Sequence, residues 1–160
     1  MLYKNKEICL SDLIINAKFV DGGRGENNEY DCWGLCLEVF RRCGMEIPDY
    51  SVVINDLSNP DVISAEDKAS ITKAINEYKI STFKRLNQPC VPCIVVLRYC
   101  LGNYYNHIGV YLGFNRFIHI ATDRGCVIEN LNSPVWRQRV EGFYFPQKYW
   151  SDINANSSNH

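Results

Sequence analysis

The side chains best suited to chemistry in this sequence are one cysteine and two histidines. Cys32 lies where the apolar spacing of the following residues predicts the first turn of a helix. Unpaired N–H groups and the helix dipole favour an anion at that position, which lowers the pKa of a thiol and makes it a nucleophile. His107 and His119 are the candidate bases, because His160 belongs to a polar C-terminal stretch. A thiolate, a histidine base and a second ring that orients the base together suit covalent catalysis.

Whether the two histidine rings can meet depends on the hairpin that carries them. They fall in neighbouring predicted strands, 107–112 and 116–120. A two-residue loop at 114–115 alone would put the rings on opposite faces of the sheet. A three-residue loop, or a bulge that shifts the register, would make them diagonal neighbours on one face, about 7–8 Å apart between backbones. If both rings act together, we therefore predict one of these two arrangements.

The elements that must position these residues are helices in the first half and short strands in the second. The spacing predicts a helix over 10–17 that Ser11 can cap, a central helix from Asp31 as N-cap to Cys43 with Gly44 after it, and a helix over 64–79. Five β-rich runs follow, at 93–99, 107–112, 116–120, 126–130 and 142–145, with Pro146 at an edge or an end. This pattern predicts an α+β domain with N-terminal helices packed on an antiparallel sheet of about five or six strands.

Length, composition and charge narrow the class of protein. A chain of 160 residues with 46% hydrophobic content is typical of one domain, expected over 1–150, with a disordered tail over 151–160. A formal charge of -1 argues against binding to nucleic acid. Apolar runs are too short to cross a bilayer, and the N-terminus lacks the apolar region of a signal peptide, so we expect synthesis in the cytoplasm.

The eight cysteines are expected to be reduced and mostly buried, because a chain of this length needs no disulfides to fold. One alternative is a zinc module built from Cys90 and Cys93 with Cys100 or Cys126, although a single Cys-x-x-Cys pair is weak support for it. A redox role for the pair is disfavoured, because the pair leads into a strand and does not open a helix. We therefore expect no metal and no organic cofactor.

Three motifs, read together, resemble the NlpC/P60 cysteine peptidases: the nucleophile motif at 30–35 (YDCWGL), the histidine strand at 107–112 (HIGVYL) and the third-residue strand at 117–119 (FIH). The resemblance implies a papain-like α+β fold and hydrolysis of peptidoglycan stem peptides. In this family Cys32 would attack the substrate, His107 would act as base and then as acid, and His119 would orient His107. The backbone N–H of Cys32 would stabilise the oxyanion.

The same resemblance points to three substrate-binding positions. Asp31 matches a family position that meets the free amine of the substrate, although it would serve equally as an N-cap. Phe19 stands where the family has a tyrosine, and so lacks the hydroxyl that would bind that amine. Trp33 replaces the serine that is common after the nucleophile. Loss of such polar partners weakens discrimination, so recognition of an N-terminal L-alanine does not transfer to this chain.

Two further segments are similar to the phage tail-assembly branch of the family: 47–50 (IPDY), and 133–136 (SPVW) leading into 142–144. They imply phage tail proteins as partners, and a place in the virion tail from which the protein reaches the host cell envelope. Two alternatives stay open: a catalytically silent structural component of a tail, and a thiol acyltransferase or amidase acting on a substrate outside the cell wall.

Overall fold

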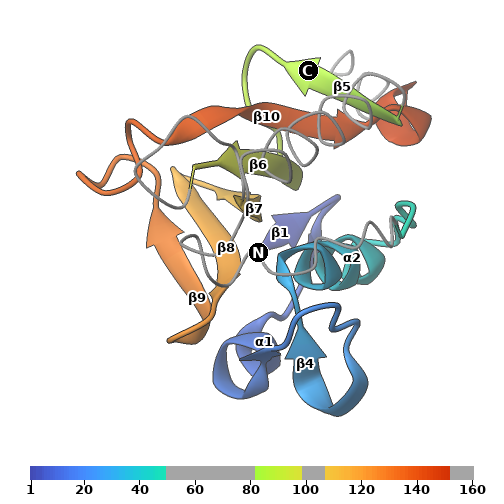
Figure 1. Cartoon of the computed structure of the whole chain (residues 1–160). Coiled ribbons are helices and arrows are strands. Elements are labelled where there is room, and N and C mark those ends of the chain that lie inside the picture. The colour runs from blue at the N-terminus through green and yellow to red at the C-terminus, as the bar shows by residue number, and fades with distance from the viewer. Residues whose placement is uncertain (50–81, 99–106, 152–160) are drawn as a thin grey trace, which may run out of the picture.

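A computed structural model describes residues 1–49, 82–98 and 107–151. Its centre is a six-stranded sheet in which all neighbours are antiparallel (Figure 1). The strands lie in the order β5-β10-β6-β7-β8-β9. Their bounds are β5 Phe83–Leu86, β6 Cys93–Leu97, β7 His107–Gly113, β8 Arg116–Ala121, β9 Gly125–Asn130 and β10 Val140–Pro146. A short 3-10 helix, Gln147–Tyr149, follows β10.

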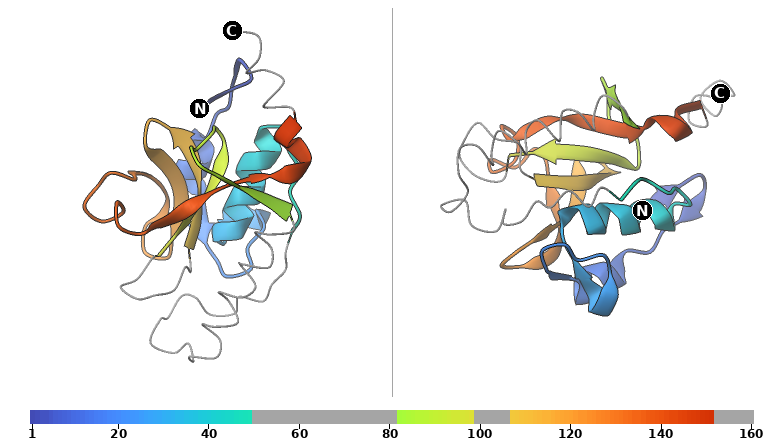
Figure 2. Two further views of the ribbon diagram at one scale, coloured as in Figure 1. Left: turned by 90° about the horizontal axis from the view of Figure 1, so that it is seen from above. Right: turned by 45° about the vertical axis from the view of Figure 1, so that its right-hand side comes forward.

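Helix α2, Cys32–Arg42, packs on one face of this sheet, against β7 and β8. Its apolar residues recur at helical spacing, and Leu35, Cys36, Val39 and Phe40 are fully buried there. The sheet twists from β5 and β10 to β9, and the helix lies inside that curve in both views of Figure 2. The beginning of α2 therefore points at the middle strands, β7 and β8.

The N-terminal segment forms a second, smaller layer beside α2 (Figure 1). It contains a two-stranded hairpin, a short helix, and a parallel strand pair that leads into α2. The bounds are β1 Leu2–Tyr3, β2 Lys6–Glu7, α1 Ser11–Asn16, β3 Lys18–Phe19, a 3-10 turn Glu26–Asn28, and β4 Glu29–Tyr30. Phe19 on β3 pairs with Tyr30 on β4, two residues before Cys32.

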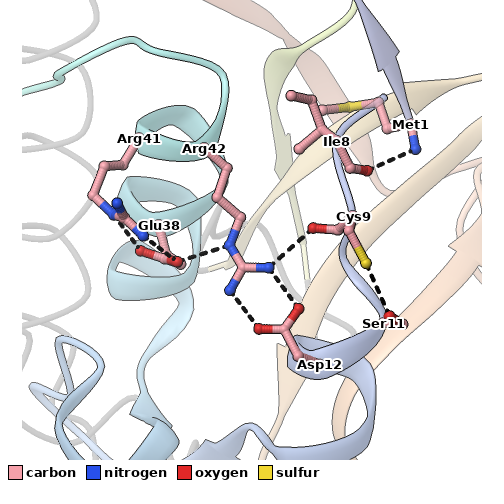
Figure 3. Close-up of polar contacts among 8 residues, drawn as sticks. All are labelled: Met1, Ile8, Cys9, Ser11, Asp12, Glu38, Arg41 and Arg42. Atoms are coloured by element: carbon pink, nitrogen blue, oxygen red, sulfur yellow. Dashed lines mark hydrogen bonds and ion pairs between the residues drawn. The ribbon is translucent and has the colours of Figure 1, made fainter. Parts of the chain in front are cut away.

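Arg42 ties the end of α2 to this N-terminal layer (Figure 3). Its guanidinium donates two hydrogen bonds of 2.6 Å to the Asp12 carboxylate and one of 2.9 Å to the carbonyl of Cys9. Glu38, one turn earlier on α2, accepts from both Arg42 and Arg41. Charge-assisted, two-pronged contacts of this kind fix orientation as well as distance. They hold the orientation of α2, and with it the position of Cys32.

The α+β prediction is confirmed, and the five predicted strands appear as β6 to β10 with bounds shifted by one or two residues. Pro146 is the last residue of β10, so the missing N–H of proline does not interrupt the ladder inside the strand. The expected helix over 64–79 and nearly all of the expected tail fall outside the described residues.

Three local expectations differ from the structure. Strand β5 was not predicted, because it spans just four residues and does not alternate: only its first and last residues, Phe83 and Leu86, are buried. Ser11 does not cap α1: the N-cap is Leu10, and the Ser11 hydroxyl contacts the Cys9 thiol at 3.0 Å instead. The apolar spacing that predicts the helix over 10–17 includes Ile14, but this side chain is 41% exposed, because a helix of six residues buries little beyond Leu13.

The β7–β8 hairpin has a two-residue turn combined with a bulge. Phe114 and Asn115 both have positive φ, which is typical of a tight hairpin turn, and Gly113 pairs with Arg116. The register then shifts between Tyr111 and Gly113, so that Tyr111 pairs with Phe117. This shift is the second of the two arrangements that allow the histidine rings to share a face.

Candidate active site

Cys32 is the first residue of α2, and its surroundings require close backbone contacts. The Asp31 side chain caps the helix by accepting a 2.6 Å hydrogen bond from the N–H of Gly34. A methyl group at Gly34 would lie 2.1 Å from the carbonyl oxygen of Gly23, a separation that no side chain tolerates. Glycine at position 34 therefore lets the loop before β4 pack closely on the first turn of α2, which carries the Cys32 thiol.

The ionisation of Cys32 differs from the sequence expectation. Burial, together with the neighbouring Asp31 carboxylate, raises the pKa of the Cys32 thiol to about 12. Hydrogen bonding to the backbone of Ile108 and Trp33 opposes this effect without overcoming it. The prediction of a lowered pKa was wrong because the helix start is covered by β7, so desolvation outweighs the helix dipole. The thiol thus meets β7 at Ile108, the residue after His107.

His107 and His119 are in direct contact. The Nε2 atom of His107 lies 2.9 Å from Nδ1 of His119, and the two rings are nearly perpendicular. Gly109 lies between them on the same face of β7, and a side chain there would lie 3.2 Å from Cβ of His119 and 2.6 Å from the Ile118 carbonyl oxygen. The missing side chain at Gly109, together with the bulge, gives the rings room to meet.

Both histidines are deeply buried, at 7% and 0% exposure, so water does not stabilise a charge on either ring. Burial lowers the pKa of His107 well below its usual value, and His119 adds to the effect. Burial also lowers the pKa of His119, although Glu129 opposes that shift. Before substrate binds, Cys32 is therefore a neutral thiol and His107 a neutral imidazole at neutral pH.

Glu129 on β9 contacts His119, and it was not among the residues predicted from the sequence. Its Oε2 lies 3.2 Å from Nε2 of His119 and also accepts from the indole N–H of Trp136, while Oε1 accepts from Arg124 at 2.8 Å. Glu129 pairs with Phe117 across β8 and β9, so it is a diagonal neighbour of His119 on one face. Counting the register of that hairpin would have found it.

Trp136 closes this cluster from the side. Its ring is only 3% exposed and lies against both histidines, nearly parallel to His107 and edge-on to His119. Phe117 stacks on the other part of His119 at 4.9 Å between ring centroids. The histidine pair is thus packed among aromatic rings, and His119 is hydrogen-bonded to Glu129 at the β9 side.

Asp31 has both carboxylate oxygens engaged. Oδ1 accepts from Gly34, and Oδ2 accepts from Arg24 at 2.7 Å. Arg24 also holds Asp49 through its Nε, at 2.9 and 3.1 Å, so one guanidinium links the loop before β4 to the segment after α2. Arg24 was not predicted from the sequence, because no periodicity relates a loop residue to its partner. In this structure the Asp31 charge is already balanced by a cation.

The other two predicted substrate-binding residues lie on either side of the nucleophile in sequence. Phe19 is partly buried beside Tyr30 in the strand pair that leads to Cys32. Trp33 is half-buried and meets Phe83 of β5 edge-on, with ring centroids 6.0 Å apart. The Trp33 ring is therefore held toward the β5 edge of the sheet by an aromatic neighbour.

The version of the zinc module that uses Cys126 finds no support in the geometry. Cys93 lies on β6 and Cys126 on β9, with β7 and β8 between them, so their backbones are at least about 14 Å apart at the usual strand spacing. The described residues contain no group of three or more Cys, His, Asp or Glu side chains that could hold a metal. Cys100 lies outside those residues. The seven described cysteines are free thiols.

Comparison with known proteins identifies the family. The model of the NlpC/P60 family matches residues 16–144, which spans α2, both histidine strands and Glu129. The chain belongs to the NlpC/P60 family. The resemblance drawn from the three motifs is thereby confirmed at family level; the phage tail branch stays a prediction.

Curated relatives agree with this assignment. The chain is 40% identical over 110 residues to the murein DD-endopeptidase MepS/murein LD-carboxypeptidase of Escherichia coli K12, and equally to those of strains O6:H1 and O157:H7. The match covers 68% of this chain and 45% of the relative, so the chain spans about half the length of the relatives.

Among solved structures, a lipoprotein-like NLP/P60 protein of Staphylococcus aureus gives a TM-score of 0.49 at 20% identity, covering 83% of this chain and 40% of that one. An NlpC/P60 protein of Bacillus cereus gives 0.46 at 18% identity, covering 86% and 40%. In the described part of the chain no helix is both long and apolar enough to cross a bilayer.

Proposed function

We propose that this NlpC/P60 domain is a cysteine peptidase or amidase that hydrolyses peptidoglycan stem peptides. One observation carries the proposal: the thiol that begins α2 meets β7 beside His107, whose ring contacts His119 at 2.9 Å. A nucleophile, a base and a group that orients the base are the parts that thiol catalysis requires. The murein endopeptidase name of the E. coli relatives supports the choice of substrate class.

In this mechanism the proton of Cys32 moves to His107 as the sulfur attacks the carbonyl carbon of the peptide bond. The backbone N–H of Cys32, at the start of the helix, donates to the oxyanion that forms. His107 then protonates the leaving amine, and a thioester to Cys32 remains. Water adds to the thioester with His107 as base again, and its hydrolysis releases the acid and restores the thiol.

Because Cys32 and His107 are both neutral at rest, the proton moves from the thiol to the imidazole as the sulfur attacks the carbonyl carbon. Burial raises the pKa of Cys32 and lowers that of His107, so a separated ion pair is disfavoured before substrate binds. The imidazolium that forms during the attack must be stabilised by the groups behind His107. His119 is the first of them.

The contacts of Asp31 favour a substrate without a free amine at the position next to the cleaved bond. Arg24 and the N–H of Gly34 occupy the Asp31 carboxylate, and Phe19 offers no hydroxyl. An incoming ammonium group would have to displace Arg24 from a contact of 2.7 Å. We therefore propose cleavage within longer stem peptides, without a requirement for an N-terminal L-alanine.

We further propose that the protein acts as part of a phage or prophage tail and reaches peptidoglycan at the host cell envelope. The support is the sequence of residues 47–50 and 133–136. Asp49 of the first segment holds Arg24, and Trp136 of the second packs on the histidines. Co-purification with tail proteins from intact virions tests this, and its absence from purified virions contradicts it.

Mass spectrometry of defined muropeptides and intact peptidoglycan, incubated with wild type and with Cys32→Ala, tests the proposed activity. We expect fragments from the wild type alone, and their masses name the bond. A fragment joined to an added amine in place of water would indicate the acyltransferase alternative. No cleavage by the wild type would favour the silent structural component.

A further inference from the structure

The contact between His107 and His119 does not by itself determine which nitrogen of each ring carries the proton. Each neutral imidazole carries one N–H and one lone pair, and either nitrogen can hold the proton. For His107 to act as base toward Cys32, the ring nitrogen that does not face His119, Nδ1, must be unprotonated. The nitrogen that faces His119, Nε2, must then carry the proton and donate it to Nδ1 of His119.

Glu129 supplies the fixed end that this chain of donors needs. A carboxylate only accepts, so Nε2 of His119, 3.2 Å from Glu129 Oε2, must be the protonated nitrogen. Nδ1 of His119 is then the acceptor, Nε2 of His107 is the donor, and Nδ1 of His107 is left unprotonated, as a general base requires. One ionised group on β9 thus determines the tautomer of both rings on β7 and β8.

The surroundings of Glu129 keep it ionised and in place. Burial alone would raise its pKa, but hydrogen bonds from Arg124 and Trp136 and the contact with His119 bring it below the usual value. Arg124, 48% exposed, holds one oxygen from the solvent side, and Asp123 lies beside it. Trp136, 3% exposed, holds the other oxygen and screens the rings from water. The carboxylate is therefore anchored on both sides of its contact with His119.

We propose that Glu129 is a positioning residue, which acts through His119 to set the proton pattern of the histidine pair and to stabilise the imidazolium that forms on His107. This inference rests on the proposed peptidase function for its importance, but its structural content stands without it. Across β7, β8 and β9, His107, His119 and Glu129 form one diagonal on one face of the sheet. Along this diagonal, the charge of the partly exposed Glu129 carboxylate acts through the fully buried His119 ring on His107.

The direct test is nitrogen NMR of the imidazole rings in 15N-labelled wild-type protein without substrate, where protonated and unprotonated ring nitrogens have distinct shifts. We expect Nε2 protonated and Nδ1 unprotonated in both His107 and His119 near pH 7. The opposite tautomer in His119 would overturn the proposal. Because no substrate is present, this result is independent of whether the protein cleaves peptidoglycan.

Glu129→Gln tests the role of the charge, with Glu141→Gln as the matched control. Glu141, on β10, also accepts from an aromatic side chain, Tyr144, and lies 3.5 Å from Arg85, away from the histidines. In Glu129→Gln we expect the pKa of His119 to fall, because the carboxylate that raised it is gone. We also expect kcat/KM to fall about 10- to 100-fold with little change in KM, the range seen when partners that orient a metal-bound histidine are lost.

Two outcomes would contradict the proposal. One is a His119 pKa in Glu129→Gln equal to that in Glu141→Gln, measured by NMR titration. The other is equal kcat/KM in the two variants, since a merely structural role would lower stability in both without a selective effect on the imidazoles. If the wild type cleaves nothing while its tautomers are as expected, the positioning role stands and the peptidase proposal fails.

Discussion

Gly109→Ala is expected to disturb the histidine pair without removing either ring. The new methyl group would lie 2.6 Å from the Ile118 carbonyl oxygen, 3.0 Å from Cδ2 of Phe117 and 3.2 Å from Cβ of His119. Ordinary contact begins near 3.4 Å, so β7 and β8 must separate by about 0.8 Å at this point. The oxygen belongs to the backbone, so no side-chain rotation relieves the clash.

The size of the effect follows from two opposing contributions. Overpacking costs about 1–3 kcal/mol, and replacing a strand glycine by alanine recovers about 0.5–1 kcal/mol. The free energy of unfolding should fall by about 1–2 kcal/mol, which lowers Tm by about 2–8 °C in a chain of this size. A displacement approaching 1 Å in a catalytic pair costs about 100-fold in rate, so muropeptide cleavage should fall by about that factor.

Gly142→Ala is the matched control, because it adds the same methyl group to another strand of the same sheet. The atoms nearest to that methyl belong to the Arg85 guanidinium and the Tyr144 ring, at 3.2–3.3 Å, and these side chains can move. Thermal unfolding by circular dichroism and chromatography of cleavage products should show little change. Wild-type cleavage by Gly109→Ala, or equal losses in both variants, would refute the reasoning about the Gly109 contact.

The remaining predictions concern the thiols and the start of α2. Arg24→Ala should free one oxygen of Asp31 and raise the cleavage of peptides with a free amine relative to their N-acetylated forms; an unchanged ratio would contradict this. Burial raises the pKa of Cys32 and of Cys126 to about 12, so above about pH 9 the unfolded chain loses thiol protons that the folded chain keeps. The free energy of unfolding in urea should fall by up to about 1.4 kcal/mol per pH unit per thiol, with a smaller slope in Cys126→Ala. Gly34→Ala should lower that free energy at pH 7 by about 3 kcal/mol or more, since its methyl would lie 2.1 Å from a carbonyl oxygen; a stable, wild-type-like variant would contradict the close contact.

Local pattern was sufficient to predict the parts of the site that lie on regular elements. Cys32 at a helix start and two histidines on neighbouring strands follow from apolar spacing alone, as does the α+β order of the elements. The condition for the rings to meet was also predictable, because strand alternation is strict. Which of the two arrangements occurs was not, since a bulge at 111–113 leaves no clear mark in the sequence.

The features of the site that could not be predicted from the sequence depend on tertiary contacts. The raised pKa of Cys32 depends on how deeply β7 covers the helix start, and that depth is set by packing. Arg24 reaches Asp31 and Asp49 from a loop, where no periodicity constrains its direction. Glu129 is different, because the register of β8 and β9 places it on the His119 face and careful counting would have identified it.

The most direct test of the central claim compares two cysteines at opposite ends of α2. Cys32 begins the helix and Cys43 follows its last residue, so Cys32→Ala and Cys43→Ala are matched changes in one element. The measurement is the rate at which new amino groups appear in purified peptidoglycan, labelled and counted after incubation with wild type and each variant. We predict a loss of at least about 1,000-fold in Cys32→Ala and a rate near that of the wild type in Cys43→Ala. Cleavage that persists in Cys32→Ala, or no release by the wild type itself, would contradict the account.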